Sequence, residues 1–430
     1  MKFLCGIAVR FFWAGPSGWR PALLGLLVVA LSGCVHPMRE GKTIPPAHRE
    51  SGGAGERQAG NPTPQGKVFE LPDKRMLRLT SVTADPVYAH LLDMSAKGWL
   101  GSDVGDSIVL SDTKTLWLFG DTFIGALSNG ARVGGAPMIN STIGIQNRQS
   151  APTSSMEFFW KEKAGKPASF FQHQTNTAGT YYWVTKGVML RGELFLFAYC
   201  IEGNDQDAAG WKVAGSALIR VPNPLDPPHQ WVQKAYPLKL EIGDTFHAGL
   251  FVSEPYLYLY GIVKPRKMAL ARVKIDDLCS GKLVEAYEFW VKGPRGEHWG
   301  SAPVNCVSQF RPVTSECAIH YEAAWGVFTC FTYSPSEPEI YLTTAKQLTG
   351  PWTRPEVIYR VPEHAAYSFP IISYAVRQHP ELAVKPGEVI LSYVTNVPGS
   401  IKELFSEEGK MIYVPQFLRL ELELDDNSGN

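Results

Sequence analysis

Five apolar runs recur along the chain, and each lies between two other segments with the character of β-strands. β-Branched and aromatic residues dominate these segments, and no long stretch beyond the N-terminal region shows helical periodicity. The runs begin 78, 63, 70 and 62 residues apart and read LWLFG from 116, LFLFAY from 194, LYLYG from 257, VFTCFTY from 327 and VILSY from 389. Five copies of a meander of three or four strands predict an all-β fold, a five-bladed β-propeller. A two-sheet sandwich is the alternative, but it does not explain the fivefold recurrence.

A further strand-like segment, MLRLTSV at residues 76–82, precedes the first repeat. We expect this segment to complete the last blade, because closing the ring removes exposed strand edges. The propeller is therefore predicted to span residues 76–425.

The N-terminal region has the pattern of a targeting segment. Lys2, Arg10 and Arg20 accompany an apolar run at 22–33, which is too short to span a bilayer. The run ends in LSGC, which resembles a bacterial lipobox and implies cleavage before Cys34 and lipid attachment to its thiol. An ordinary secretory signal followed by an accidental cysteine is the alternative.

The predicted organisation is a lipoprotein signal peptide at 1–33, a flexible linker at 34–75 and the propeller. The linker assignment rests on its abundance of glycine, proline, serine and charged residues. Since the implied lipid carries enough hydrocarbon for stable anchoring, we expect a membrane-anchored protein of the bacterial cell envelope, outside the cytoplasm.

The charge balance and the cysteine spacing of the chain exclude several classes of binding partner. The chain has 41 basic and 41 acidic residues, so it lacks the basic field of a nucleic-acid-binding protein, and no nucleic-acid partner is expected. We expect a monomer whose contact with the membrane is made by the lipid. The cysteines after Cys34 form no C-x-x-C pair, which disfavours zinc and redox chemistry. One disulfide, joining Cys306 to Cys330 or to Cys317, is an open expectation for an oxidising compartment.

The first repeat carries a group of carboxylates. Its first two strands are predicted to form a hairpin about SDTK, residues 111–114, which places Asp121 opposite Gly105 or Asp106. Asp103, Asp106 and Asp121 would then converge on one mouth of the central channel. Like charges in a partly enclosed site repel each other and separate their pKa values.

The corresponding places in the other repeats complete a predicted ring. Its members are polar or aromatic, and they are Trp183 and Lys186 in the second repeat, His247, Glu316, and Tyr367 with Ser368 in the fifth. An aspartate facing a glutamate beside an aromatic platform suits glycoside hydrolysis, in which one carboxylic acid protonates the leaving oxygen. Each residue also has a structural interpretation: a turn former for the aspartates, a solvated strand start for Glu316 and a core histidine for His247. No D-x-D-x-D loop is present, so no metal or other cofactor is expected, with structural calcium as the alternative.

Several stretches resemble a known family over about residues 76–423. They are GSDVGDSIVLSDTKTLWLFGDTFIG, INSTIGIQ, LTGPWTRPEVIY, ISYAVRQHPEL and VILSYVTN. They are similar to bacterial five-bladed propellers long filed as domains of unknown function, near the arabinanase, levansucrase and fructosidase clan. Some relatives in that family cleave D-arabinan as endo-acting glycosidases. The GDT and GPW signatures are more specific for the fold than for an activity.

The resemblance implies roles for individual residues. It makes Asp103 and Asp121 the leading catalytic carboxylates and Asn140 and Asn396 candidates for binding sugar hydroxyls. Glu316 matches only by its place in the repeat. At position 106 the resemblance to the D-arabinan-cleaving relatives implies an apolar residue, but this chain has Asp106. The additional carboxylate leaves open which two residues form the catalytic pair.

Three functions follow as competing hypotheses. The first is a surface-anchored glycoside hydrolase that acts on a furanose-rich, arabinan-like polysaccharide through paired carboxylates at the propeller axis. The second is a noncatalytic carbohydrate-binding or surface-assembly propeller, because fold does not fix function. The third is another enzyme on the same frame, such as a glycan phosphorylase or transferase.

Overall fold

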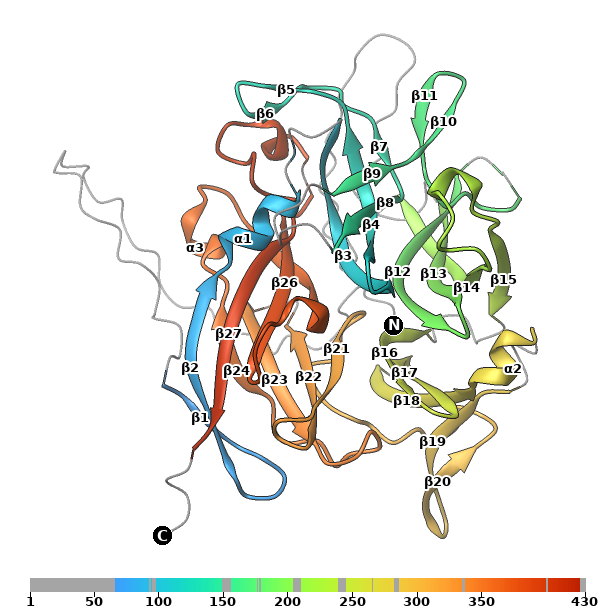
Figure 1. Cartoon of the computed structure of the whole chain (residues 1–430), viewed down its shortest axis with the longest axis vertical. Coiled ribbons are helices and arrows are strands. Elements are labelled where there is room, and N and C mark those ends of the chain that lie inside the picture. Colours follow the sequence, from blue (N-terminus) through green and yellow to red (C-terminus); the bar gives the residue numbers. More distant parts are fainter. Residues whose placement is uncertain are drawn as a thin grey trace, which may run out of the picture.

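The computed structural model describes most of the chain after residue 65. The described residues are 66–425 except 93, 95–97, 149–155, 176, 178, 204–209, 239–244, 265, 282–285, 335–336 and 400. Five antiparallel sheets surround a common axis (Figure 1), so the predicted five-bladed β-propeller is confirmed. The predicted signal peptide, Cys34 and most of the predicted linker lie outside the described residues.

Each blade is one sheet whose strands follow each other outward from the axis. Blade one contains β3 (Trp99–Ser111), β4 (Lys114–Ile124), β8 (Thr142–Asn147) and β9 (Glu157–Phe159). Blade two contains β12 (Thr180–Leu190), β13 (Glu193–Gly203), β14 (Trp211–Val221) and β15 (Lys234–Leu238). Blade three contains β16 (Thr245–Ser253), β17 (Tyr256–Val263), β18 (Lys267–Lys274), β19 (Glu288–Gly293) and β20 (Gly296–Gly300).

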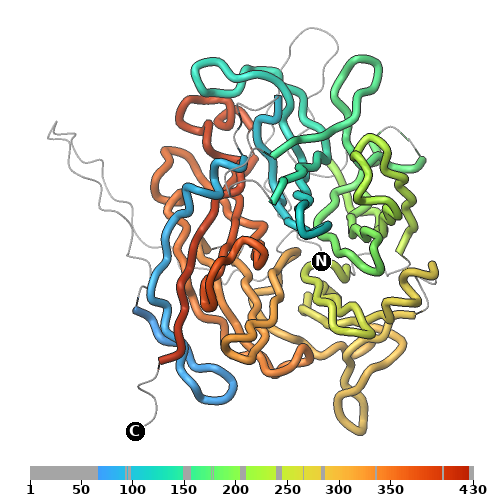
Figure 2. The backbone as a smooth tube through the Cα atoms, in the orientation of Figure 1, coloured from blue at the N-terminus to red at the C-terminus, as the bar shows by residue number. Residues whose placement is uncertain are grey.

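The remaining two blades close the ring. Blade four contains β21 (Ala318–Glu322), β22 (Val327–Tyr333), β23 (Glu339–Ala345) and β24 (Glu356–Arg360). Blade five contains β25 (Ile372–Gln378), β26 (Glu388–Asn396), β27 (Gln416–Leu424), β2 (Met76–Ala84) and β1 (Val68–Glu70). Here the N-terminal strand β2 pairs with the C-terminal β27, which Figure 2 shows as blue beside red. The predicted closure is confirmed, and β1 extends the sheet to residue 68, ahead of the predicted start at 76.

The five recurring apolar runs are the second strands of the five blades, β4, β13, β17, β22 and β26. They carry side chains that pack between neighbouring blades. Leu118 and Leu196 meet between blades one and two, and Phe197 and Leu259 share the cluster between blades two and three. Every other pair of adjacent blades has such a cluster of its own. The repeat in the sequence therefore reflects one apolar interface per blade boundary.

Short helices, single turns and small hairpins connect or extend the blades. The short helices are α1 (Pro86–Ala89), α2 (Ile275–Cys279) and α3 (Glu363–Ala366), with single 3-10 turns η1 (His90–Leu92), η2 (Pro228–Gln230), η3 (Pro380–Leu382) and η4 (Glu403–Phe405). Over the described ranges, no helix is long and apolar enough to cross a membrane. In blade one, β7 (Met138–Ile139) also pairs with β4. Two small hairpins, β5 (Leu127–Ser128) with β6 (Ala131–Arg132) and β10 (Lys161–Lys163) with β11 (Lys166–Ala168), extend from blade one.

The cysteines and the surface add two observations. All five cysteines of the described region are free thiols, so the expected disulfide of Cys306 is not formed in the structure. Cys306 lies in the apolar cluster between blades two and three, whereas Cys317 and Cys330 lie in the cluster between blades three and four. This separation explains why Cys306 does not pair with either.

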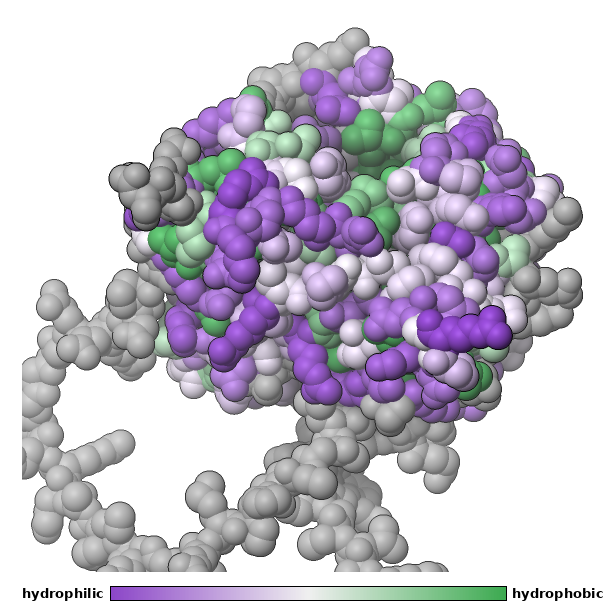
Figure 3. All heavy atoms as spheres, turned by 90° about the horizontal axis from the view of Figure 1, so that it is seen from below, coloured by the Kyte–Doolittle hydropathy of each residue, from purple (hydrophilic) through white to green (hydrophobic). Residues whose placement is uncertain are grey.

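The face in Figure 3 is a mixture of polar side chains and small apolar areas.

Candidate active site

Asp103 and Asp121 lie beside each other at the inner edge of blade one. Ser102 pairs with Thr122 and Val104 with Phe119, so Asp103 is placed against the Gly120–Asp121 step of β4. The prediction that Asp121 stands opposite Gly105 or Asp106 is therefore wrong by up to three positions. The reason is a series of register shifts in this hairpin, which a regular antiparallel ladder does not include.

The backbone around Asp103 has an unusual conformation. Val104 has a φ of 71° and Gly105 a φ of 64°, both in the left-handed region. That region is costly for a β-branched residue, and such strain concentrates at functional sites. Gly120 is required for a different reason, since a Cβ atom there would lie 2.2 Å from Oδ1 of Asp103. The glycines of DVGD and FGDT thus allow the two aspartates to approach each other.

Asp121 is a buried carboxylate that is held by two donors. The side-chain amide of Asn140 donates to its Oδ1 at 3.0 Å, and the indole N–H of Trp183 in blade two donates to the same oxygen at 2.8 Å. Burial raises the pKa of Asp121 to about 6, although these two hydrogen bonds act in the opposite direction. The sequence prediction placed all three residues in the site, and the structure brings them together.

Asp103 is only partly buried and faces the centre of the ring. The hydroxyl of Tyr374, on β25 of blade five, donates to its Oδ2 at 3.0 Å. Burial raises the pKa of Asp103 well above its ordinary value, and the charges of Asp121 and Glu316 raise it further. Asn396 donates to the Tyr374 hydroxyl at 3.3 Å, so this predicted sugar-binding residue supports Tyr374 from a buried position.

These groups surround a narrow pocket of about 30 Å³. Its lining combines carboxylates, rings and a hydroxyl, and consists of Asp103, Val104, Gly120, Trp183, Thr185, Tyr199, Glu316 and Tyr374. Four blades therefore contribute to one axial site. Carboxylates beside aromatic rings form a surface that suits a sugar ring, which has polar edges and apolar faces.

Glu316 reaches the pocket from the segment that leads into β21. Nη2 of Arg377 donates to its Oε1 at 2.6 Å, and the Tyr333 hydroxyl lies 3.4 Å from Oε2. Both Glu316 and Arg377 are buried. The glutamate is thus present at the site as predicted, but its carboxylate is paired with a guanidinium.

A second set of charges adjoins the pocket without lining it. Nζ of Lys186 donates to Oδ1 of Asp106 at 2.6 Å, and Nε of Arg377 lies 3.7 Å from the same oxygen. With Glu316, the network has two positive and two negative side chains. Asp106 and Lys186 therefore pair with each other beside the pocket, and neither lines it.

β-Bulges explain this division into two layers. Beside the pocket, the inner strands of blades one, two and five each have an extra residue, at Gly105, at Thr185 and at Ala375–Val376. Residues ahead of the bulges line the pocket, and these are Asp103, Trp183 and Tyr374. Residues directly after the bulges form the buried charge network, and these are Asp106, Lys186 and Arg377.

Two predicted residues lie elsewhere. His247 is buried, its Nδ1 is 2.9 Å from the Thr185 hydroxyl, and burial lowers its pKa to about 3, so it is a neutral positioning group and not a pocket residue. Tyr367 ends α3 and packs against Phe369, away from the pocket lining. Its predicted place is taken by Tyr374.

Tyr374, Arg377 and Tyr199 were missed by reasoning from the sequence. Tyr374 and Arg377 both occur in the quoted stretch ISYAVRQ, so the signal was present, but the extra residue between them hides their alternation. In the described residues there is no group of three or more histidine, cysteine, aspartate or glutamate side chains that could hold a metal ion.

The comparisons with known proteins agree with this architecture. The family model described as "Domain of unknown function (DUF5005)" matches residues 85–422, so the chain belongs to that family. No curated protein matches the chain. A solved structure from Bacteroides ovatus ATCC 8483, named as a candidate hydrolase, has 15% identity and a TM-score of 0.65, and the match covers 85% of this chain and 97% of that one. This likeness shows the fold.

More remote matches include propellers from glycoside hydrolases. The GH43_1 enzyme from Xanthomonas citri, solved with xylotriose, has 10% identity and a TM-score of 0.42, with 80% of this chain and 95% of that chain covered. The α-L-arabinofuranosidase PaAbf62A from Podospora anserina, solved with cellotriose, has 8% identity and a TM-score of 0.39, with 76% and 92% covered.

Proposed function

We propose that this protein is a glycoside hydrolase whose catalytic pair is Asp103 and Asp121. The observation that carries the proposal is the placement of two carboxylates with raised pKa values side by side at the propeller axis. Asp103 lines a pocket with aromatic walls, and Asp121 lies directly behind that lining, where the pocket residue Trp183 donates to it. Pairs of carboxyl groups whose environments separate their pKa values are the means by which glycosidases obtain an acid and a base at one pH.

The surroundings of Asp103 and Asp121 indicate which carboxyl group donates a proton and which acts as base or nucleophile. Asp103 has the more strongly raised pKa and is the more exposed of the two, so it is the proton donor to the leaving glycosidic oxygen. Asp121 titrates near pH 6 and is ionised at neutral pH, so it either takes a proton from the attacking water or attacks the anomeric carbon itself. The glycosidic C–O bond breaks as the proton moves from Asp103 to the departing oxygen.

Glu316 has an electrostatic role in this proposal. Its carboxylate is bound by Arg377 and lines the pocket. There it favours the positive charge that develops on the sugar ring in an oxocarbenium-like transition state. Trp183, Tyr199 and Tyr374 provide the walls against which the ring is placed.

The substrate class in this proposal is a furanose-rich, arabinan-like polysaccharide. The family resemblance of the GSD, GDT and INS stretches supports it. Lipid attachment at Cys34 would hold the enzyme at the cell envelope, where such polymers occur outside the cytoplasm.

A noncatalytic carbohydrate-binding propeller is the second candidate. The observations that favour it are the narrow pocket and the two hydrogen bonds that already occupy Oδ1 of Asp121. Release of reducing sugar from arabinan, fructan and cell-envelope arabinogalactan tests the two functions. Release that Asp103→Asn and Asp121→Asn both abolish supports the hydrolase, whereas binding of a polysaccharide without any release supports the second candidate.

A further inference from the structure

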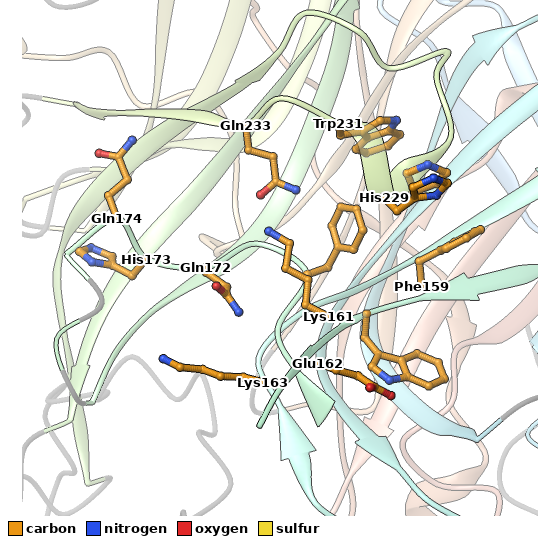
Figure 4. A pocket seen from close by; sticks show the side chains of 13 residues that line it. Phe159, Lys161, Glu162, Lys163, Gln172, His173, Gln174, His229, Trp231 and Gln233 are labelled. Atoms are coloured by element: carbon orange, nitrogen blue, oxygen red, sulfur yellow. The ribbon is translucent and has the colours of Figure 1, made fainter. Parts of the chain in front are cut away.

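A large groove lies away from the axis, between blades one and two. Its walls come from the β10–β11 hairpin, from the segment after it and from the connection that contains η2 and leads into β15 (Figure 4). The main hollow has a volume of about 770 Å³, and an adjoining one has about 260 Å³. The two hollows share the lining residues Lys161, Gln172, Gln174, Trp231 and Gln233. Together they form an elongated site that is much larger than the axial pocket.

Aromatic rings form one wall of this groove. Phe170 and Trp231 meet edge to face, with their centroids 5.7 Å apart. The Trp231 indole N–H already donates to the carbonyl of Asp226 at 2.9 Å, which fixes the orientation of the ring. Phe159 and Trp160 belong to the same lining. Phe170 and Trp231 are themselves buried, so the half-buried rings of Phe159 and Trp160 are the ones that offer apolar surface to the C–H faces of sugars.

Amide side chains provide the polar part. Gln172 and Gln233 extend toward the middle of the hollow, where the Lys161 side chain also ends (Figure 4). Nε2 of Gln174 donates to the carbonyl of Ala235 at 2.8 Å, which holds that amide in place. An amide has donors and an acceptor at one end, so it can bind a pair of neighbouring sugar hydroxyls. Rings and amides in an open, elongated groove are suited to an oligosaccharide.

The charged side chains Lys161, Glu162 and Lys163 line the main hollow, and Lys161 is the one that gives it a preference for acidic ligands. It is half-buried, its Nζ lies 5.9 Å from the centroid of Phe170, and within the described part of the chain no carboxylate forms an ion pair with it. Burial lowers its pKa, as expected for an ammonium that lacks a carboxylate partner. An acidic group on the bound sugar would supply that partner through a charge-assisted hydrogen bond.

We propose that this groove is a second glycan-binding site, specific for an oligosaccharide that bears an acidic group such as a uronate carboxylate. The wall of the groove is also continuous with the axial site. The backbone N–H of Phe170 donates to the Ser141 carbonyl at 2.9 Å, and the N–H of Asn140 donates to Oγ of Ser169 at 2.9 Å. Since Asn140 holds Asp121, a chain bound in the groove rests on the segment that positions a proposed catalytic carboxylate.

Binding calorimetry on the purified protein tests the proposal without relying on any hydrolysis. The probes are a tetragalacturonate and, as the neutral comparison, xylotetraose at the same concentration and ionic strength. We expect the acidic probe to bind at least about tenfold more tightly, and Lys161→Met to remove that preference. Gln233→Glu, which places a negative charge in the groove and removes an amide donor, should weaken binding of the acidic probe by a clearly larger factor than binding of the neutral probe. Lys234→Met is the matched control, because Lys234 adjoins Gln233 in sequence but does not line either hollow.

Three outcomes would overturn the proposal. The first is no binding of either probe at millimolar concentration. The second is equal binding of the two probes that Lys161→Met does not alter, which would remove the charge preference. The third is acidic binding that Lys234→Met abolishes and Lys161→Met does not, which would place the site elsewhere. Thermal melts of the three variants establish that each remains folded.

Discussion

The indole of Trp183 in blade two donates a hydrogen bond of 2.8 Å to the carboxylate of Asp121 in blade one. Two blades therefore fix one carboxyl group, and the contact depends on the correct packing of neighbouring sheets. The same holds for Asp103, which accepts from Tyr374 of blade five. The site is assembled by ring closure, so residues far apart in the sequence determine its geometry.

Asp121→Asn should remove most of the glycosidase activity and preserve the fold. An amide cannot act as base or nucleophile, and the loss of general acid–base help alone costs roughly 10²–10⁴-fold in rate. The amide retains the shape of the side chain and removes a buried charge, so the melting temperature at neutral pH should not fall. Asp112→Asn, in the exposed turn at the opposite end of the hairpin, is the control and should change neither quantity. Equal losses in both variants would show that the active site is not at this end of the hairpin.

Activity and stability should respond to pH in opposite directions near pH 6. Because burial raises the pKa of Asp121 to about 6 from an ordinary 3.8, activity should rise as this carboxyl ionises and fall at higher pH as Asp103 loses its proton. The folded state binds the Asp121 proton more tightly than the unfolded state does. Stability from this group is therefore greatest below about pH 4 and is lost as the pH rises to about 6, by about 3 kcal/mol.

Initial rates and urea denaturation measured from pH 4 to 9 check this relationship. In Asp121→Asn, the fall in stability between pH 4 and 6 should be reduced, because the titrating group is gone. A stability that rises over that range in the wild type, and is unaltered in the variant, would contradict the raised pKa.

Gly120→Ala should inactivate the enzyme although it replaces neither proposed catalytic carboxylate. The new Cβ would lie 2.2 Å from Oδ1 of Asp103, so the carboxyl has to move. A displacement of about 1 Å at a catalytic group can cost about 10²-fold in rate. The measurement is kcat on the same substrate, with circular dichroism to confirm the fold. Gly134→Ala, which introduces a methyl group into open space, should be neutral.

The repeat made the architecture predictable, whereas the bulges made the site only partly so. The apolar runs follow from packing between blades, which repeats regularly, and so the number of blades and the order of strands could be inferred. Asp103, Asp121 and Trp183 were placed in the site from their positions in the repeats, whereas Asn140 was implied by the family resemblance. Tyr374 was missed because the extra residue at Ala375–Val376 interrupts the two-residue alternation on which strand predictions depend.

Lipidation can be tested separately from catalysis. Cys34→Ala should release the expressed protein from the membrane fraction, because the lipid on Cys34 is the proposed attachment. The partition of the full chain between detergent and aqueous phases measures this, with Cys5→Ala, which alters a cysteine ahead of the proposed cleavage site, as the control. A Cys34→Ala protein that still partitions wholly with membranes would contradict the lipobox interpretation.

The pairing of Arg377 with Glu316 should dominate the stability of the channel. Arg377→Met leaves the buried carboxylate of Glu316 without its cation and should cost about 3–5 kcal/mol in the free energy of unfolding. Adding Glu316→Gln to that variant removes the unpaired charge and should restore much of the loss. Arg191→Met, whose ion pair with Glu254 is exposed, should have a far smaller effect. Strictly additive losses in the double variant, measured by urea denaturation, would show that the two side chains do not stabilise each other.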